Sequence, residues 1–217
     1  MKNLVILCDF DGTITIEDTG VVALDNFTDE DWRHYDKLLE SEEITLEECI
    51  KTQFEMLKGN KEEILEVLIK SVNLRPNTEK FIEFCHQNNI PFIILSAGLD
   101  FAINYYMEQF NNSYNIPLYS PKTEFLNNKV RLTFPPLEDK KSKNFKQDIV
   151  LKYNKIDNIS IYIGNGLSDF EGVRVADYAY VVKNSKLANL CKEEEITHME
   201  FVDFMEIITD MKNRFKE

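Results

Sequence analysis

The stretch LVILCDFDGTIT, residues 4–15, decides the fold. Its first six residues are an apolar run that ends at Asp9, which is typical of a strand buried on both faces of a parallel sheet. Such strands present polar residues at their carboxyl ends, where open α/β sheets bind ligands. Asp9 and Asp11 are two residues apart, so in an extended chain they share a side. Crowded carboxylates need a cation between them or a retained proton, so a metal site, an acid/base pair or both is predicted; an Asp-Gly turn with solvated acids is the alternative.

The composition is that of an ordinary globular protein with an acidic surface. With 217 residues, 43% of them hydrophobic, the chain can bury a sizeable core. The net charge of −13 argues against nucleic acid or an anionic membrane as a partner. We see no signal-peptide pattern and no apolar run of membrane-spanning length, so we expect a cytoplasmic protein. Its four scattered cysteines are expected as reduced core thiols: Cys8, Cys49, Cys85 and Cys191.

Strand patterns that alternate with helical patterns predict an α/β fold, namely a Rossmann-like parallel sheet with helices on both faces. Buried strands are expected at residues 4–9, 91–96, 159–163 and 178–182. Residues 116–134 alternate and contain Asn127-Asn128, which predicts a small β-hairpin. The last helix, about 203–215, is expected to bury Phe204, Ile207, Ile208 and Met211.

A long helical stretch separates the first two strands and is too long for a simple crossover. We expect three or four short helices there, with a capping box at Thr45 and Glu48. Thr78 is expected to cap the next helix, which runs to about Asn88. The chain is therefore divided into a catalytic core, 1–15 and 76–217, and an inserted helical cap, 16–75.

Polar side chains follow three of the predicted strands, and in a parallel sheet these strand ends lie on one edge. Lys146, on the helix before the third strand, can reach the same edge. Carboxylates there can hold Mg²⁺, while hydroxyl, ammonium and backbone N–H groups can clamp a phosphoryl group. The candidate side chains and amides are Asp9, Asp11, Ser96, Ala97, Gly98, Lys146, Asn165 and Asp169. Neither G-x-G-x-x-G nor G-x-x-x-x-G-K-[ST] occurs, so no nucleotide loop is expected.

The order DFDGTIT, a Ser after an apolar strand, a Lys and then GNGLSD resembles the haloacid-dehalogenase-type phosphatases, in their phosphoserine-phosphatase branch. The resemblance covers nearly the whole chain. It implies that Asp9 is the nucleophile, which forms an aspartyl-phosphate, and is also a metal ligand. It implies that Asp11 is the general acid/base, with its backbone carbonyl on the metal, and that Mg²⁺ is the cofactor.

The same resemblance gives the remaining site residues their roles. Ser96 matches the phosphate-binding hydroxyl, and the Ala97 and Gly98 amides lie beside it. Lys146 matches the lysine that neutralises phosphoryl and nucleophile charge; Lys143 is the rival, and Lys146 is preferred for its distance before Asn165. Asp169 matches the second acid of the last motif.

Asn165 departs from the family pattern, in which the last motif reads G-D-G-x-x-D and its first Asp is a metal ligand. An amide oxygen can coordinate Mg²⁺ but carries no charge, so a lower affinity is expected, with Asp169 as a compensating ligand. The alternative is a weakened enzyme that binds phosphate without turnover.

The cap predicts a small phosphorylated metabolite as substrate, because caps of this kind close over the site and select the leaving group. Within the branch the chain is most similar to the methionine-salvage phosphatases, which act on 2-hydroxy-3-keto-5-methylthiopentenyl 1-phosphate. The similar segments are DFDGTIT followed by Asp18, LSAGLDF at 95–101, the hairpin, and GLSDFEGVRVAD at 166–177.

Several alternatives stay open from the sequence. Phosphoserine and phosphocholine or phosphoethanolamine phosphatases are relatives in the same branch, and a phosphomutase would use the same motifs. Glu17, Asp18 and Arg33 are candidate contacts from the cap or solvated helix charges. Apolar residues on the cap or hairpin could pair two copies, so a homodimer is possible.

Overall fold

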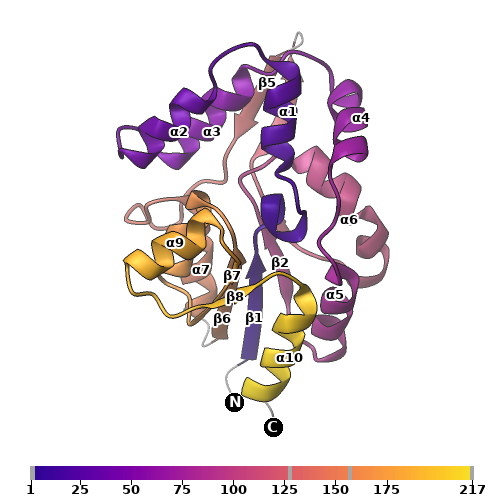
Figure 1. The fold of residues 1–217 in the computed structure, drawn as a ribbon, viewed down its shortest axis with the longest axis vertical. Helices are drawn as coiled ribbons and strands as arrows, with labels where there is room; N and C mark the ends of the chain where they lie inside the picture. The colour runs from indigo at the N-terminus through magenta and orange to yellow at the C-terminus, as the bar shows by residue number, and fades with distance from the viewer. Residues whose placement is uncertain (1–2, 127–128, 156–157, 216–217) are drawn as a thin grey trace.

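The computed structural model describes residues 3–126, 129–155 and 158–215, and its centre is a parallel sheet (Figure 1). All neighbouring strands in this sheet pair in the same direction, and β1 lies between β2 and β6. In spatial order the strands are β3 (Leu118–Tyr119), β2 (Phe92–Leu95), β1 (Asn3–Cys8), β6 (Asn158–Gly164), β7 (Tyr178–Val182) and β8 (Met199–Phe201). This confirms the predicted α/β fold, including its antiparallel hairpin outside the sheet.

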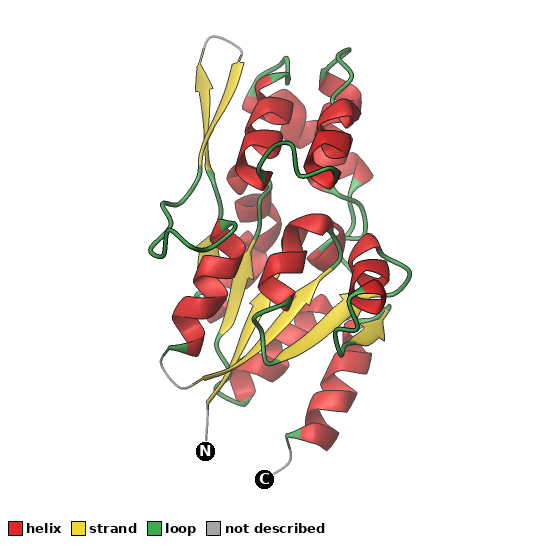
Figure 2. Ribbon diagram, turned by 90° about the vertical axis from the view of Figure 1, so that its left-hand side faces the viewer, coloured by secondary structure: helices red, strands yellow, loops and turns green. Residues whose placement is uncertain are grey.

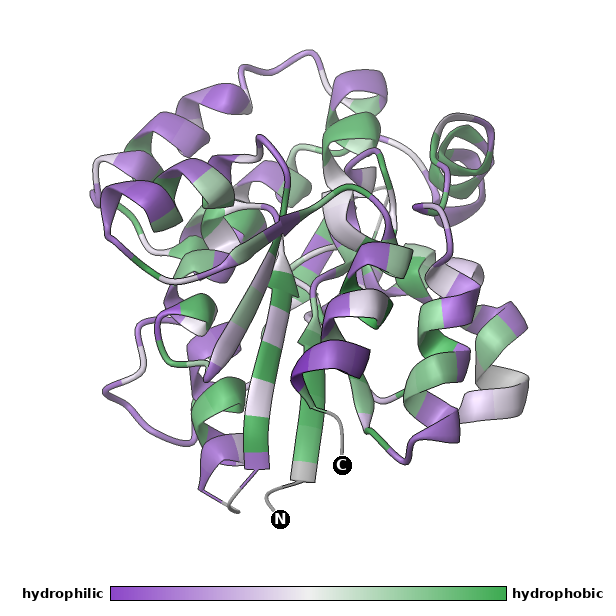
Figure 3. Ribbon diagram, turned by 60° about the horizontal axis from the view of Figure 1, so that its bottom comes forward, coloured by the Kyte–Doolittle hydropathy of each residue, from purple (hydrophilic) through white to green (hydrophobic). Residues whose placement is uncertain are grey.

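Helices cover both faces of the sheet because alternate side chains of β1 are buried on opposite sides. Ile6 and Cys8 belong to one apolar cluster, and Val5 and Leu7 belong to the other. The first face is covered by α5 (Thr78–Gln87), α6 (Asp100–Tyr114) and α10 (Phe204–Arg214), and the second by α7 (Phe145–Asn154), α8 (Phe170–Val173) and α9 (Lys186–Glu193). Hydrophobic residues accordingly concentrate along the central strands (Figure 3).

Four helices occupy the stretch between β1 and β2: α1 (Thr19–Phe27), α2 (Arg33–Glu40), α3 (Leu46–Glu55) and α4 (Lys61–Ser71). Thr45 and Glu48 form the expected capping box at the start of α3. A backbone bridge between Thr15 and Leu74 brings the two ends of the stretch together. The four helices lie at the end of the molecule opposite to the two termini (Figure 1).

The predicted hairpin is present but shorter than expected. It contains β4 (Lys122–Leu126) and β5 (Lys129–Thr133), and its expected Asn127-Asn128 turn lies outside the described residues. Leu118 and Tyr119 instead join the parallel sheet beside β2, because this short segment continues the edge of the sheet. The hairpin extends beside the four helices (Figure 2), and Val130 and Leu132 of β5 are buried.

Three smaller findings concern the remaining expectations. Asn77, in the left-handed region with φ 62°, precedes α5, and Thr78 donates its hydroxyl to the Arg75 carbonyl, so the expectation that Thr78 caps this helix is wrong. The last helix buries the four residues expected of it, and the four cysteines are buried free thiols. In the part of the chain that is described, no helix is long and apolar enough to cross a membrane.

Candidate active site

The site begins where β1 ends, at the buried Asp9. Its backbone N–H donates to the Ile163 carbonyl at 2.8 Å, which continues the pairing of β1 with β6. The chain then makes a wide turn, η1 (Phe10–Ile14), which the Thr15 N–H closes on the Phe10 carbonyl at 3.0 Å. Gly12 has φ +73°, and a Cβ there would lie 2.2 Å from the Asn165 amide nitrogen. Only glycine therefore lets this turn approach the loop after β6.

Lys146 joins the first and last motifs through its ammonium group. Its Nζ lies 2.7 Å from Asp9 Oδ1, 2.6 Å from Asp169 Oδ1 and 3.2 Å from Ser168 Oγ. The side chain is completely buried, and it comes from α7, which packs on the second face of the sheet. Lys143 instead pairs with Glu171 at 3.2 Å with 60% of its side chain exposed. The geometry therefore places Lys146 beside Asp9, whereas Lys143 pairs elsewhere.

Asp169 accepts several hydrogen bonds that fix the loop after β6. Oδ1 also accepts the Tyr162 hydroxyl at 2.9 Å, and Oδ2 accepts the backbone N–H groups of Asn165 and Gly166 at 3.0 and 2.9 Å. Together with Lys146 these are four donors on two oxygens, so the carboxylate is fully used within the protein. This arrangement supports a role for Asp169 in holding the loop that presents Asn165.

Asp11 lies between the first helix of the inserted stretch and the loop after β2. Its Oδ1 accepts the backbone N–H of Thr19 at 3.1 Å and also the Thr19 hydroxyl, and its Oδ2 accepts Ser96 Oγ at 3.1 Å. Ser96 Oγ in turn accepts the Gly98 N–H at 3.0 Å. A Cβ on Gly98 would lie 2.1 Å from Asp11 Oδ2, so glycine is required there too.

Thr13, which sequence reasoning did not single out, places Asn165 beside Asp9. Its hydroxyl lies 3.1 Å from Asp9 Oδ2 and 3.0 Å from Asn165 Oδ1, and both oxygens are acceptors. A hydroxyl has one proton, so it satisfies only one of them at a time. Two acceptor oxygens therefore converge where one hydroxyl proton can satisfy only one of them, an arrangement that would fit a cation.

The local charges also fit a cation. Burial, followed by the charge of Asp169, raises the pKa of Asp9 well above its usual value, although Lys146 opposes this. Burial raises the pKa of Asp11 despite hydrogen bonds from Thr19 and Ser96. Burial and the Asp11 charge raise the pKa of Asp18 to about 7. Among the site residues that the structure describes, the carboxylates outnumber the one ammonium group, that of Lys146, and a divalent cation would offset the excess.

The oxygen atoms of the site would suit Mg²⁺. Among the described residues no three His, Cys, Asp or Glu side chains form a metal-binding group, so neutral oxygens have to contribute. The Asn165 amide oxygen, which shares the Thr13 hydroxyl with Asp9, is one such neutral oxygen, and the Asp11 backbone carbonyl is the one that the family resemblance implies. Hard cations such as Mg²⁺ take oxygen ligands of this kind and usually keep several waters.

A cavity of about 100 Å³ lies over these groups, and its lining includes Asp9, Asp11, Gly98 and Asn165. It adjoins a second cavity of about 260 Å³ that reaches between α1, α2 and α3. The apolar side chains of the second cavity include Val21, Leu24, Trp32, Leu39, Leu46 and Phe54. Its polar lining includes Asp36 and Gln53, whose amide nitrogen bonds Asp36 Oδ1 at 2.7 Å.

The three candidate contacts from the inserted stretch have different surroundings. Asp18 lines both cavities and accepts the Val21 N–H at 2.9 Å as the N-cap of α1. Glu17 accepts the Asn73 N–H at 2.8 Å, which ties the two ends of the stretch together. Arg33 pairs with Asp25 at 2.7 Å and lies over the Trp32 ring. Of the three, Asp18 is the one that the structure places in the cavities.

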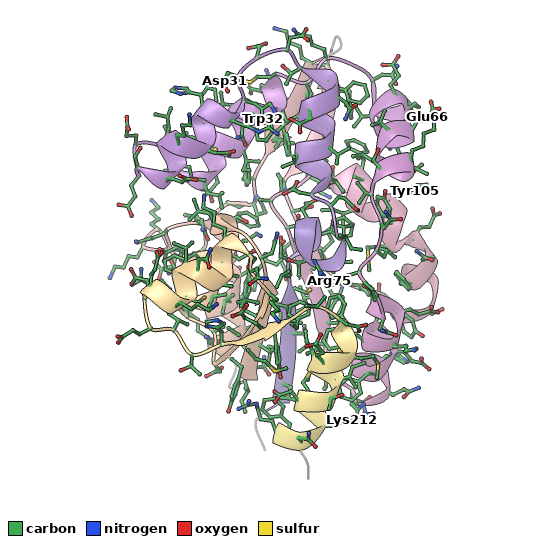
Figure 4. All side chains as sticks on the ribbon, viewed as in Figure 1. Asp31, Trp32, Glu66, Arg75, Tyr105 and Lys212 are labelled. Atoms are coloured by element: carbon green, nitrogen blue, oxygen red, sulfur yellow. The ribbon has the colours of Figure 1, made fainter. Side chains whose placement is uncertain are left out.

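Arg75 is a further residue that sequence reasoning missed. Figure 4 shows it below the η1 turn, where its Nε donates to the Thr13 carbonyl and an Nη donates to the Gly12 carbonyl, both at 2.7 Å. The other Nη donates to the Val202 carbonyl at 3.2 Å. Its position after Leu74, in a stretch with Pro76, indicates only a linker and no functional role. The buried guanidinium fixes the turn that carries the first motif.

Comparison with known proteins shows the family. The model of the haloacid dehalogenase-like hydrolases matches residues 6–174. The chain therefore belongs to this family, and the membership predicted from its motifs is confirmed.

Curated relatives cover nearly the whole chain. A 2-hydroxy-3-keto-5-methylthiopentenyl-1-phosphate phosphatase of Brevibacillus brevis is 28% identical over 95% of this chain and 94% of the relative. One of the same name from Geobacillus thermodenitrificans is 26% identical over 97% of this chain and 96% of the relative. A solved phospho-aspartyl intermediate analogue of phosphoserine phosphatase has a TM-score of 0.72, with 20% identity over 96% of this chain and 99% of that one, which supports the fold.

Proposed function

We propose that the chain is a Mg²⁺-dependent phosphatase that hydrolyses a small phosphomonoester through an aspartyl-phosphate on Asp9. The observation that carries this proposal is the pair of carboxylates at one cavity, where Asp9 bonds Lys146 at 2.7 Å and Asp11 bonds Ser96 at 3.1 Å. Asp9 is thus held by the ammonium group of Lys146, whereas Asp11 is held by hydroxyl and backbone N–H groups. This difference suits a nucleophile and a general acid.

Two steps follow from this arrangement. An Asp9 oxygen bonds to phosphorus while the bond to the leaving oxygen breaks, and Asp11 gives its proton to that oxygen. Asp11 then takes a proton from water, which attacks the phosphorus and releases Asp9 and inorganic phosphate. Lys146 offsets negative charge on Asp9 and the phosphoryl group, while Ser96 and the amides of Ala97 and Gly98 bind phosphoryl oxygens.

Asp9, the Asp11 backbone carbonyl and the Asn165 amide oxygen would hold the metal. Bound Mg²⁺ would offset the charge that develops on the transferred group. Asp169 would act on this set through its hydrogen bonds to Lys146 and to the Asn165 backbone rather than as a ligand. This version of the site keeps Asn165 in the metal shell without requiring a further carboxylate.

The second cavity supports the substrate of the curated relatives. Among the described residues that line it, Lys186 is the cation, and it is paired with Glu40. A leaving group with a carboxylate, as in phosphoserine, would find no spare positive charge there. A methylthio-substituted carbon chain would contact Leu24, Trp32 and Phe54. We therefore rank 2-hydroxy-3-keto-5-methylthiopentenyl 1-phosphate first.

The acidic residues of the same cavity favour a second candidate. Asp18 and Asp36 line it beside the Trp32 and Phe54 rings, and carboxylates and aromatic faces attract cations. Phosphoethanolamine or phosphocholine would place a cationic group there. A phosphomutase and a phosphate-binding protein without turnover are the further alternatives.

The test is a phosphate-release assay on a matched panel of esters. We expect Mg²⁺-dependent release from the methylthiopentenyl ester, lower kcat/KM for phosphoethanolamine and the lowest for phosphoserine. Asp9→Asn, checked for folding by circular dichroism, should abolish release. Retained activity in this variant would contradict the nucleophile, release of little inorganic phosphate would indicate a mutase, and binding of phosphate without any turnover would indicate a lapsed enzyme.

The remaining assignments are part of the same proposal. Residues 16–75 act as a cap domain over a core of 1–15 and 76–217. The protein works in the cytoplasm on a metabolite, and the net charge of −13 argues against nucleic acid as a partner. A homodimer stays a prediction, which light scattering would test.

A further inference from the structure

One glutamate of the inserted helices reaches the helix that carries Lys146. Glu47, in the first turn of α3, accepts the backbone N–H of Phe145 through Oε1 at 3.0 Å. Phe145 is the first residue of α7, and Lys146 follows it. Glu47 and Phe145 are 98 residues apart, so this contact forms only when the first turn of α3 lies near the first turn of α7. In Figure 1, α3 lies above α7 on the same side of the molecule.

The contact meets a physical need at the start of α7. The first N–H groups of a helix have no partner within the helix and carry partial positive charge. Asn144 satisfies the N–H of Gln147 at 2.9 Å as the N-cap. The Phe145 N–H is left for another acceptor, and the Phe145 side chain is buried. Glu47 supplies that acceptor from the other segment of the chain.

The same helix α3 also faces the proposed reaction. Ile50, one turn after Glu47, lines both cavities. A displacement of α3 would therefore change the cavity and remove the hydrogen bond to α7 together. Since Lys146 Nζ makes bonds of 2.7 and 2.6 Å to two buried carboxylates, a small shift of the first turn of α7 would lengthen both.

A second contact has the same design. Glu40 at the end of α2 pairs with Lys186, the first residue of α9. The next residue, Leu187, donates its N–H to the Asn165 carbonyl at 3.0 Å. Glu47 thus binds the residue before Lys146, and Glu40 binds the residue before Leu187. The Glu40–Lys186 pair is about half exposed and is the weaker of the two contacts.

We propose that Glu47 is a positioning residue for the reaction, which links the seating of the cap helices to the placement of Lys146 against Asp9. The proposal rests on the proposed function, because Lys146 matters to turnover only if Asp9 is the nucleophile. It assigns Glu47 no contact with substrate. Its effect passes through the Phe145 N–H and the first turn of α7.

Kinetics of Glu47→Ala and Glu47→Gln test the proposal. Glu47→Ala should lower kcat about tenfold for large and small esters alike and weaken inhibition by inorganic phosphate, because both depend on Lys146. Glu47→Gln keeps an oxygen acceptor for the Phe145 N–H and should retain kcat within about twofold of the parent. Glu55→Ala, an exposed position at the other end of α3, is the matched control and should leave kcat unchanged.

A purely structural role would lower the melting temperature of Glu47→Ala without changing kcat or phosphate inhibition of the folded protein, and that result would overturn the proposal. Amide hydrogen exchange at Phe145 gives a second test that needs no turnover: exchange should be about tenfold faster in Glu47→Ala than in the parent. Equal exchange would also overturn it. If the parent hydrolyses no ester, the proposed function fails, while this exchange test still decides whether Glu47 holds α7.

Discussion

The two halves of the site hold their carboxylates by different means. On the core half, Asp9 and Asp169 share the buried ammonium group of Lys146. On the other half, called the cap half because it adjoins α1 although Asp11 and Ser96 belong to the core, Asp11 and Asp18 are held by the hydroxyls of Thr19 and Ser96 and by backbone N–H groups at the start of α1. The core half therefore offsets part of its charge with an internal ammonium group, whereas the cap half has only dipoles.

This difference separates the two chemical roles. Burial raises the pKa of both Asp9 and Asp11, but only Asp9 has a fixed ammonium group hydrogen-bonded to it, which would suit a nucleophile, whereas the neutral donors around Asp11 would suit a group that gives and takes a proton. Asn165 lies at the boundary, where Thr13 joins it to Asp9. A cation at that boundary would add to the core half the positive charge that Lys146 alone does not supply.

Removing the cation of the core half should have the largest effect. Lys146→Met leaves Asp9 and Asp169 buried without their shared partner, which should cost about 3–5 kcal/mol of unfolding free energy. Turnover should fall by about 100-fold or more, because the phosphoryl charge loses its counter-charge. Urea unfolding and phosphate release measure the two effects.

Lys143→Met is the matched control for this prediction. Lys143 lies on the same side of the sheet with 60% of its side chain exposed, so its loss should cost about 0–1 kcal/mol and leave turnover near the parent value. If the two variants behaved alike, the core half would not depend on an internal cation and the comparison would fail.

Adding a charge at the boundary should have a smaller effect. Asn165→Asp supplies the carboxylate that the family pattern has at this position, and the Mg²⁺ concentration for half-maximal activity should fall about tenfold. Without Mg²⁺ the variant should be less stable than the parent, because a further carboxylate joins the cluster. Asn184→Asp adds the same charge at an exposed position and should change neither value. An unchanged Mg²⁺ dependence in Asn165→Asp would show that this residue is not a ligand.

The sequence predicts the core half better than the cap half. Strands such as β1 and β6 are continuous apolar runs that end in polar residues, so periodicity locates both the sheet edge and Asp9 and Asn165. The family resemblance supplies the lysine role, and the distance before Asn165 favours Lys146 over Lys143 for it. β8 was not predicted, because Met199–Phe201 is short and only its last residue is fully buried.

The contacts that complete the site depend on distant parts of the chain, and local pattern does not encode them. Arg75 donates to carbonyls more than 55 residues away, and two of the four donors to Asp169 are backbone N–H groups whose direction only the folded loop sets. The role of Thr13 likewise depends on a partner 152 residues away. Sequence therefore locates the chemical groups, and the fold decides which of them are already used.

Neutralising a carboxylate of the cap half should have the smallest effect, and its sign depends on pH. Burial and Asp11 raise the pKa of Asp18 to about 7, so in metal-free protein its contribution to stability is full below about pH 4 and is lost as the pH rises through 7. Asp18→Asn keeps an oxygen for the Val21 N–H and does not titrate. Between pH 5 and 8 the unfolding free energy of the parent should therefore fall relative to the variant, by on the order of 1–2 kcal/mol because the carboxyl is partly solvated.

Asp25→Asn on the same helix is the control, since Arg33 lowers the pKa of Asp25 and no change is expected in this range. If the difference in unfolding free energy between the parent and Asp18→Asn stayed the same from pH 5 to 8, ionisation of Asp18 would cost no stability. The two halves of the site would then differ only in where their carboxylates lie.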